Sequence, residues 1–227
     1  MHIWSRRFID LAIRSKAIRF GEYTLKSGRI SPFFFNAGQF NDGAALVELG
    51  DIYADAIVNA IHQHGLEFDL MFGPAYKGIP LVAVVAASLA RRHRLNVPIA
   101  YDRKEAKAHG EGGQTVGAEI KGRVLIVDDV LSGGTAFNQS RPKIENAGGQ
   151  VVGLVIGMDR QERARGSQRS ASDTVRASGA HVVAVASLED VIERLRALPD
   201  YEQHVSAMLG YQSEYGAGEN TGASKSL

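Results

Sequence analysis

The sequence contains no cysteine among its 227 residues. Disulfide bridges and thiolate metal sites are therefore excluded, and the composition fits a reducing compartment. Charged residues interrupt the longest apolar stretches well before the roughly 18 residues that a membrane-spanning helix needs. The N-terminus also lacks the apolar core of a signal peptide. We therefore expect a soluble cytoplasmic protein.

The chain also lacks an excess of charge of either sign. Lys and Arg number 26 and Asp and Glu 25, so the formal net charge at pH 7 is +1. No general attraction to nucleic acid or to an anionic membrane is expected, and any anion site must be local. The length suits one α/β domain with a sizeable core.

Short apolar segments that predict buried β-strands alternate with helical patterns along most of the chain. The expected strands are residues 68–72, 98–101, 123–127, 151–158 and 181–186, and the expected helices include 44–61 and the segment after Ile79. This alternation favours parallel crossover units, with ligands bound beyond the carboxyl ends of the strands. We expect an α/β fold with a Rossmann-like central parallel sheet flanked by helices.

The first 40 or so residues show a different pattern. Trp4, Phe8, Leu11 and Ala12 recur at helical spacing, and two β-prone runs flank a turn at residues 26–29. These residues are expected to form a small N-terminal hood of a helix and a β-hairpin.

Three segments depart from regular patterns. Pro142 interrupts the helix expected after Thr135, so that helix is expected to start late or to be kinked. Residues 103–118 are rich in glycine and charge and predict a mobile loop. The end of the chain is rich in Gly, Ser and Asn, so we expect one domain over residues 1–214 and a flexible tail over residues 215–227.

The strongest chemical signal lies at residues 124–136, where an apolar strand leads into Asp128 and Asp129 and then into a loop of small residues. Glycines and hydroxyl groups in such a loop can surround a phosphate at the start of a helix. The two carboxylates can accept hydrogen bonds from sugar hydroxyls. A phosphorylated ribose would satisfy both. The loop residues are Ser132, Gly133, Gly134 and Thr135.

An ordinary turn after a strand capped by two acids is the alternative explanation of these residues. A Walker loop is excluded, because its spaced glycine, lysine and hydroxyl are absent. The order of strand, paired acids, glycines and hydroxyls favours the phosphate site.

A second candidate site is residues 73–78, between an expected strand and an expected helix. Its glycines and Lys77 suit a diphosphate bound by backbone amides and one ammonium group. Alone, the segment would be a surface turn with a solvated lysine. Its place one crossover before the acid pair favours diphosphate binding.

A third candidate is residues 101–113, where three cations and a histidine precede several glycines. Such a segment can close positive charge over an anion. Most runs of charged residues are only solvated loops, and taken alone residues 101–113 would also be interpreted as a solvated loop. The four residues are Arg103, Lys104, Lys107 and His109.

Taken together, these segments resemble the type I phosphoribosyltransferases. Residues 124–136 resemble their ribose-phosphate-binding motif, and residues 73–78 resemble their pyrophosphate loop, in which a non-proline cis peptide is often found. The Arg-Lys-Glu-x-Lys-x-His-Gly pattern of residues 103–110 and the hairpin with Lys26 resemble the orotate phosphoribosyltransferases in particular. The resemblance extends to about Leu198.

The resemblance implies the type I phosphoribosyltransferase fold and an activity. The phosphoribosyl group of 5-phosphoribosyl 1-pyrophosphate (PRPP) would pass to orotate, giving orotidine 5′-phosphate and pyrophosphate in pyrimidine (UMP) biosynthesis. Magnesium would be held mainly by the substrate and water, with no dedicated protein metal site. A homodimer is implied, with the segment from Arg103 to His109 acting as a lid on the neighbouring subunit's site.

The resemblance also implies roles for individual residues. The catalytic residues would be Arg103, Lys107, His109, Asp128 and Asp129. The other PRPP-binding residues would be Lys26, Tyr76, Lys77, Lys104, Val130, Leu131, Ser132, Gly133, Gly134, Thr135 and Ala136. The orotate-binding residues would be Lys26, Phe34, Phe35, Ser132 and Arg160, with Arg160 against the orotate carboxylate.

Two departures and two rival functions accompany this resemblance. Ser132 and Gly133 stand where a Thr-Ala pair is more usual, and Pro142 interrupts the following helix.

A purine phosphoribosyltransferase would share the acid pair but should lack the lid pattern and the Lys26 hairpin. A regulator that only senses PRPP would need a DNA-binding module or a basic face, and the sequence indicates neither.

Overall fold

The computed structural model describes residues 1–25, 27–103, 115–131, 135–164 and 166–217. The strands are β1 (Ile18–Thr24), β2 (Ile30–Phe35), β3 (Leu70–Gly73), β4 (Ile99–Asp102), β5 (Thr115–Gly117), β6 (Gly122–Val130), β7 (Gly149–Asp159) and β8 (His181–Ser187). The helices are α1 (Ile3–Arg14), α2 (Gly43–His64), α3 (Gly78–His93), α4 (Thr135–Asn146), α5 (Ala171–Ala177), α6 (Leu188–Arg196) and α7 (Glu202–Tyr215), with short 3-10 turns η1 (Ala37–Gln39) and η2 (Pro199–Tyr201). Among the described residues, none of the helices combines the length and apolar character needed to cross a bilayer.

The central sheet has six strands in the order β5-β4-β3-β6-β7-β8. β4, β3, β6, β7 and β8 run parallel, as the sequence predicts. β5 pairs antiparallel with β4, so the sheet is mixed. The prediction of an unstructured loop throughout residues 103–118 is therefore wrong at residues 115–117, where a short edge strand finds backbone partners on β4.

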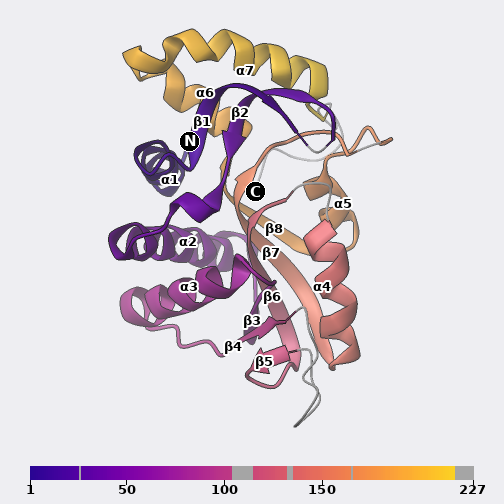
Figure 1. Ribbon diagram of the computed structural model, residues 1–227. Helices are drawn as coiled ribbons and strands as arrows, with labels where there is room; N and C mark the ends of the chain where they lie inside the picture. The colour runs from indigo at the N-terminus through magenta and orange to yellow at the C-terminus, as the bar shows by residue number, and fades with distance from the viewer. Residues whose placement is uncertain (26, 104–114, 132–134, 165, 218–227) are drawn as a thin grey trace.

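Helices cover both faces of this sheet. α1, α2 and α3 lie on one face and α4 and α5 on the other. α6 packs against β8, and α7 and the β1–β2 hairpin lie together above the sheet in Figure 1. Alternate residues of β6 pack into the two separate cores, Leu125 on the α2 and α3 side and Ile126 on the α4 side. Because both faces are buried, β6 reads as a continuous apolar run rather than an alternating one.

The N-terminal hood has the expected helix and hairpin. β1 and β2 pair antiparallel, with Ile18 opposite Phe35 and Thr24 opposite Ile30. No element is predicted after residue 186, yet α6 and α7 follow β8 and pack against each other and beside the hood. α7 contacts β2, so the end of the described chain supports the hairpin.

The predicted boundary at residue 215 falls inside a paired segment. The carbonyl of Tyr215 accepts a hydrogen bond from the amide of Arg163 at 2.9 Å, and the amide of Ala217 donates to the carbonyl of Gln161 at 2.9 Å. The remainder of the predicted tail, residues 218–227, lies outside the described residues.

The helix after the small-residue loop begins at Thr135 and runs through Pro142 to Asn146. Of the two alternatives expected from Pro142, the late start is therefore wrong, and the kink stays a prediction. The helix forms ahead of Pro142, and the donor missing at Pro142 is the one that would bond to the carbonyl of Asn138, near the middle of the helix.

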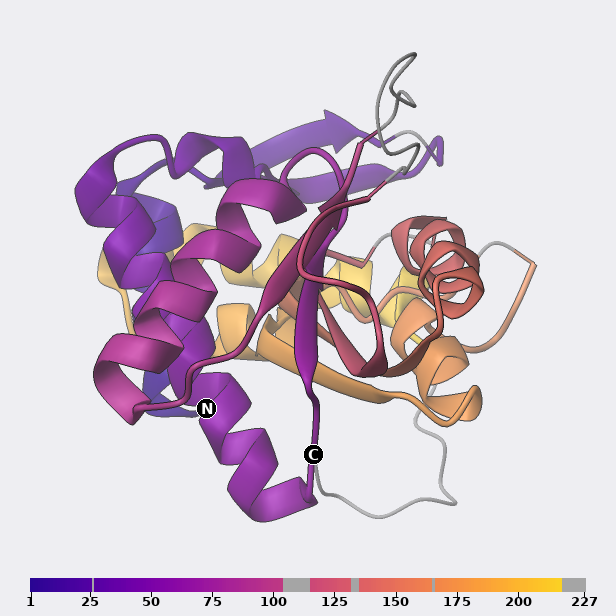
Figure 2. The same cartoon turned by 90° about the horizontal axis from the view of Figure 1, so that it is seen from below.

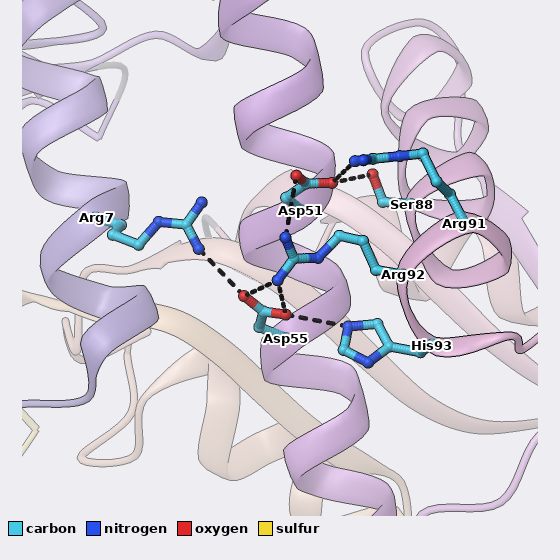
Figure 3. A network of polar contacts seen from close by, with 7 residues as sticks. All are labelled: Arg7, Asp51, Asp55, Ser88, Arg91, Arg92 and His93. Atoms are coloured by element: carbon cyan, nitrogen blue, oxygen red, sulfur yellow. Dashed lines mark hydrogen bonds and ion pairs between the residues drawn. The ribbon is translucent and has the colours of Figure 1, made fainter.

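A network of ions joins the three helices on one face of the sheet (Figure 3). Asp51 of α2 accepts hydrogen bonds from Ser88 at 2.8 Å and from Arg91 at 2.5 Å. Burial raises the pKa of Asp51, but these bonds and the charges of the neighbouring arginines outweigh it, and the pKa lies below its ordinary value of 3.8. The full network comprises Arg7, Asp51, Asp55, Ser88, Arg91, Arg92 and His93.

Candidate active site

Four neighbouring strands end at one edge of the central sheet. β4, β3, β6 and β7 end at Asp102, Gly73, Val130 and Asp159. The β1–β2 hairpin passes across this edge (Figure 2), and its side chains bond to residues that follow β7. Ligands of open α/β sheets bind beyond the carboxyl ends of the strands. The candidate active site therefore lies between this edge and the hairpin.

The acid pair ends β6, as the sequence predicts. Asp128 and Asp129 are both buried, with 8% and 7% of their surface exposed. The amide of Asp129 donates to Oδ1 of Asp128 at 2.8 Å. Burial, and then the charge of Asp129, raise the pKa of Asp128 to about 7. A proton on Asp128 is therefore held up to neutral pH in the ligand-free site.

Lys77 connects the acid pair to the predicted diphosphate loop. Its Nζ lies 2.9 Å from Oδ2 of Asp129, and 52% of the lysine side chain is exposed. Because β3 and β6 are neighbours, the ammonium group and the acid pair meet at the same point of the edge. The ammonium compensates the charge of Asp129 and still faces solvent, so it can also contact an incoming anion.

The loop at residues 73–78 turns tightly from β3 into α3. A Cβ atom on Gly73 would lie 2.3 Å from the carbonyl oxygen of Gly78, so only glycine fits there. The peptide bond between Ala75 and Tyr76 is cis, as the resemblance implies. Tyr76, another predicted PRPP-binding residue, is largely exposed in this loop.

Asp102 lies at the start of the third candidate segment, where it was given no role, yet it holds the diphosphate loop. Its Oδ1 accepts the amide N–H of Ala75 at 2.5 Å, and its Oδ2 pairs with Nζ of Lys143 at 2.6 Å. A polar residue at the carboxyl end of a predicted strand was the one available signal. Lys143 lies on α4 and gave no signal.

Arg160 lies at the end of β7, beneath the hairpin. Its Nε donates to Oε1 of Glu162 at 2.6 Å and its Nη2 to Oγ of Ser31 at 3.0 Å. The guanidinium carbon lies 4.0 Å from the ring centre of Phe33. The hydroxyl of Tyr211 on α7 donates to Glu162 at 2.8 Å. Arg160 is thus buried and held by the segment after β7, by β2 and by α7. It is not an ordinary surface cation.

The neighbouring phenylalanines of β2 point to different environments. Phe35 packs against Phe8, with ring centres 5.9 Å apart, in the hood core. Phe34 faces Tyr23, with ring centres 5.6 Å apart, and is half-buried. Successive side chains of a strand alternate between its faces. The two rings therefore lie on opposite faces of the hairpin.

Several predicted site residues lie outside the described residues: Lys26, Lys104, Lys107, His109, Ser132, Gly133 and Gly134. Thr135 and Ala136 begin α4, and Arg103 directly follows β4. Val130 ends β6 and Leu131 is buried in the core beneath α4, so a ligand would meet their backbone. The described residues bring together Asp128, Asp129 and Lys77, with Arg160 directly after the adjacent strand β7.

Comparisons with known proteins identify the family of the chain. Residues 45–190 match the model of the phosphoribosyl transferase domain. Orotate phosphoribosyltransferases from Enterobacter sp. (strain 638) and Salmonella newport (strain SL254) are 44% and 45% identical to this chain over 216 residues, which is 95% of this chain and 100% of each relative. The crystal structure of orotate phosphoribosyltransferase from Francisella tularensis is similar with a TM-score of 0.79 and 41% identity, over 92% of this chain and 98% of that one. The chain belongs to the phosphoribosyltransferase family, in its orotate phosphoribosyltransferase branch.

Proposed function

We propose that this protein transfers the phosphoribosyl group of PRPP to orotate, giving orotidine 5′-phosphate and pyrophosphate in pyrimidine biosynthesis. The observation that carries the proposal is the order of groups along the sheet edge. The diphosphate loop follows β3, the acid pair ends β6 and Arg160 follows β7, on three adjacent strands. In the reacting substrates the ribose likewise lies between the departing diphosphate and the incoming base.

The chemistry follows from the charges at this edge. Displacement at the anomeric carbon builds positive charge on the ribose and negative charge on the departing pyrophosphate. Asp128 and Asp129 accept hydrogen bonds from the ribose hydroxyls and favour the cationic ring. Lys77 receives the pyrophosphate, together with Arg103 and the cations of the lid, Lys104, Lys107 and His109.

Arg160 suits the carboxylate of orotate. Within the described residues its bonds use Nε and Nη2, so Nη1 can donate to a ligand. Glu162 compensates part of its charge and is itself paired with Arg29 at 3.2 Å, which leaves the three-residue group with a net positive charge for an anion. Phe34, which is not packed against the core as Phe35 is, offers the planar base a ring, while Phe35 contributes backbone. Lys26 and Ser132 complete the proposed orotate contacts.

Magnesium fits this donor set. Two carboxylates stand beside the place of a diphosphate, and hard oxygen donors of substrate and water are the ligands that magnesium prefers. The ion would neutralise the diphosphate when bound, and Asp128 and Asp129 would hold it through water. The protein groups themselves orient the ribose and receive the pyrophosphate.

The assay that tests the function follows the loss of orotate absorbance with PRPP and magnesium. Adenine, hypoxanthine and uracil serve as alternative bases. Turnover with orotate alone is expected, because Arg160 selects a carboxylate. Turnover with a purine and none with orotate would refute the proposal.

The shared lid has its own test. Lys107→Ala and Asp128→Asn variants should each be nearly inactive as separate dimers. If the lid of one subunit serves the other's site, a mixed dimer carries one intact site, and re-equilibrated equal mixtures should recover about a quarter of the normal activity. A mixture as inactive as its components would exclude a lid shared between subunits.

A further inference from the structure

We propose that Asp102 is a positioning residue that fixes the diphosphate loop to the base of the lid, and that Lys143 holds its carboxylate in place. The proposal rests on the proposed function, since it concerns how PRPP is bound. The hydrogen bonds of the Asp102 side chain within the described residues go to Ala75 and Lys143, so it acts on the ligand through the loop at residues 73–78.

Both oxygens of Asp102 have a partner, each from a different part of the chain. Oδ1 accepts the amide of Ala75, 27 residues earlier in sequence, and Oδ2 accepts Nζ of Lys143, 41 residues later. Only 5% of Asp102 is exposed. A buried carboxylate is costly unless it is paired and hydrogen-bonded, and removing one partner leaves the other group unsatisfied. The side chain is therefore held in one orientation.

Asp102 is also the residue from which the lid segment departs. It is the last residue of β4 and lies opposite Thr115, the first residue of β5, in the antiparallel pair. The segment between these two residues carries the lid pattern. The backbone of Asp102 thus forms the lid base, while its side chain holds the neighbouring strand's loop.

The loop has little freedom to compensate for a lost contact. Gly73 and Gly78 approach so closely that a single Cβ atom does not fit between them, and Lys77 between them is bound to Asp129. An amide of Ala75 that rotates away from Asp102 would carry the adjoining peptide groups and Lys77 with it. Asp102 therefore determines how the loop presents its amides and its ammonium group to a diphosphate.

Lys143 extends the connection to a third segment. It lies on α4, the helix that follows the proposed ribose-phosphate loop. One carboxylate thus joins the diphosphate loop after β3, the lid base at β4 and the helix after β6. Binding of PRPP engages all three, so this contact favours a single relative arrangement of them.

The experiment compares Asp102→Ala, Asp102→Asn and Lys143→Met in the full chain. Asparagine keeps an oxygen for Ala75 but loses the ion pair, and Lys143→Met removes only the ammonium group. Arg141→Met is the matched control, because Arg141 lies on the same helix in an exposed pair with Glu145 at 2.7 Å. The readouts are the Kd of PRPP with magnesium by calorimetry in the absence of any base, KM for PRPP and for orotate, and Tm.

Asp102→Ala should raise the Kd and KM of PRPP about tenfold, with KM for orotate within about twofold of normal. Asp102→Asn and Lys143→Met should each raise them about threefold, and the double variant should be no worse than either one, because both remove the same pair. Arg141→Met should change neither value. A purely structural role would lower Tm and leave the Kd of PRPP unchanged in all variants, which would overturn the proposal. If Asp102→Ala does not fold, the other two variants decide.

Failure of the proposed function gives a different result. If the unaltered protein binds PRPP but does not convert orotate, the orotate assignment fails. The Kd values of PRPP for the Asp102 and Lys143 variants still test the role of Asp102. If the unaltered protein does not bind PRPP, both proposals are refuted.

Discussion

Replacing Asp128 by asparagine is expected to stabilise the protein at alkaline pH and to inactivate it. Asp128 ends the central strand β6 beside Asp129, and only 8% of its surface is exposed. Burial and the neighbouring charge raise its pKa from the ordinary 3.8 to about 7. Asparagine has nearly the same shape and carries no charge at any of these pH values.

The magnitude follows from proton linkage. The folded protein keeps the proton of Asp128 up to about pH 7, whereas the unfolded chain releases it near pH 4, so stability falls as pH rises through that window. Each pKa unit corresponds to about 1.4 kcal/mol, so the total loss by alkaline pH is about 4 kcal/mol. Between about pH 5 and pH 8 the loss is about 3 kcal/mol.

Urea unfolding of both proteins at about pH 5 and pH 8 measures this difference. Asp128→Asn should gain about 3 kcal/mol relative to the unaltered protein over that interval, while its kcat falls at least about tenfold. Asp200→Asn, which removes an exposed carboxylate, controls for the general loss of surface charge. An equal stability difference at both pH values would refute the buried-charge explanation.

Four further predictions concern other parts of the fold and site. Asp51→Asn should lower stability by about 2 kcal/mol in urea unfolding at neutral pH, because the charge-assisted bonds of the buried Asp51 to Arg91 and Arg92 are lost. Since the pKa of Asp51 is below 3.8, its contribution should persist down to that pH and disappear at lower pH. Phe33→Ala should cost about 4 kcal/mol of stability, because Phe33 is fully buried. Phe34→Ala should cost far less and instead raise KM for orotate. Lys77→Met should raise KM for PRPP about tenfold with little change in Tm, since half of the side chain is exposed.

The parallel strands and the long helices were predictable because their burial leaves a clear pattern of apolar residues in the sequence. A strand buried on both faces gives a continuous apolar run, and a helix gives apolar residues at helical spacing. Residues 124–127 of β6 and 151–158 of β7 are runs without a charged residue, and the observed bounds of the two strands differ from the predicted ones by at most three residues. α2 follows from its helical spacing in the same way, and extends the predicted span by one residue at its start and three at its end. Two-sided burial leaves few alternatives for such segments.

The elements that were not predicted bury little or are held from outside. β5 has three residues, none of them fully buried, and exists because β4 offers it an edge. α7 buries only Met208 and Tyr211. α6 did carry a local signal, the capping box in which Ser187 and Asp190 bond each other's backbone. That pattern at the end of a predicted strand indicates a helix start.

The residues of the candidate site also fall into predictable and unpredictable groups. Asp128, Asp129 and Lys77 were predictable because each belongs to a contiguous motif. The contacts of Asp102 with Lys143 and of Glu162 with Tyr211 join residues 41 and 49 positions apart. No local pattern records such pairs, since they depend on which strands become neighbours. The sequence therefore predicts the groups that meet the ligand better than those that hold these groups in place.

The acid pair places charged groups where folding energetics favour apolar ones. Val124 to Val127 are fully buried, and the same strand then continues into two carboxylates. Lys77 compensates Asp129, but Asp128 keeps its unfavourable environment until a ligand supplies hydrogen-bond donors. Ribose hydroxyls and a bound cation would convert this buried charge from a destabilising group into a binding contact. The stability gained and the activity lost in Asp128→Asn are therefore two results of one cause, which is the pattern expected of a residue retained for catalysis at the expense of stability.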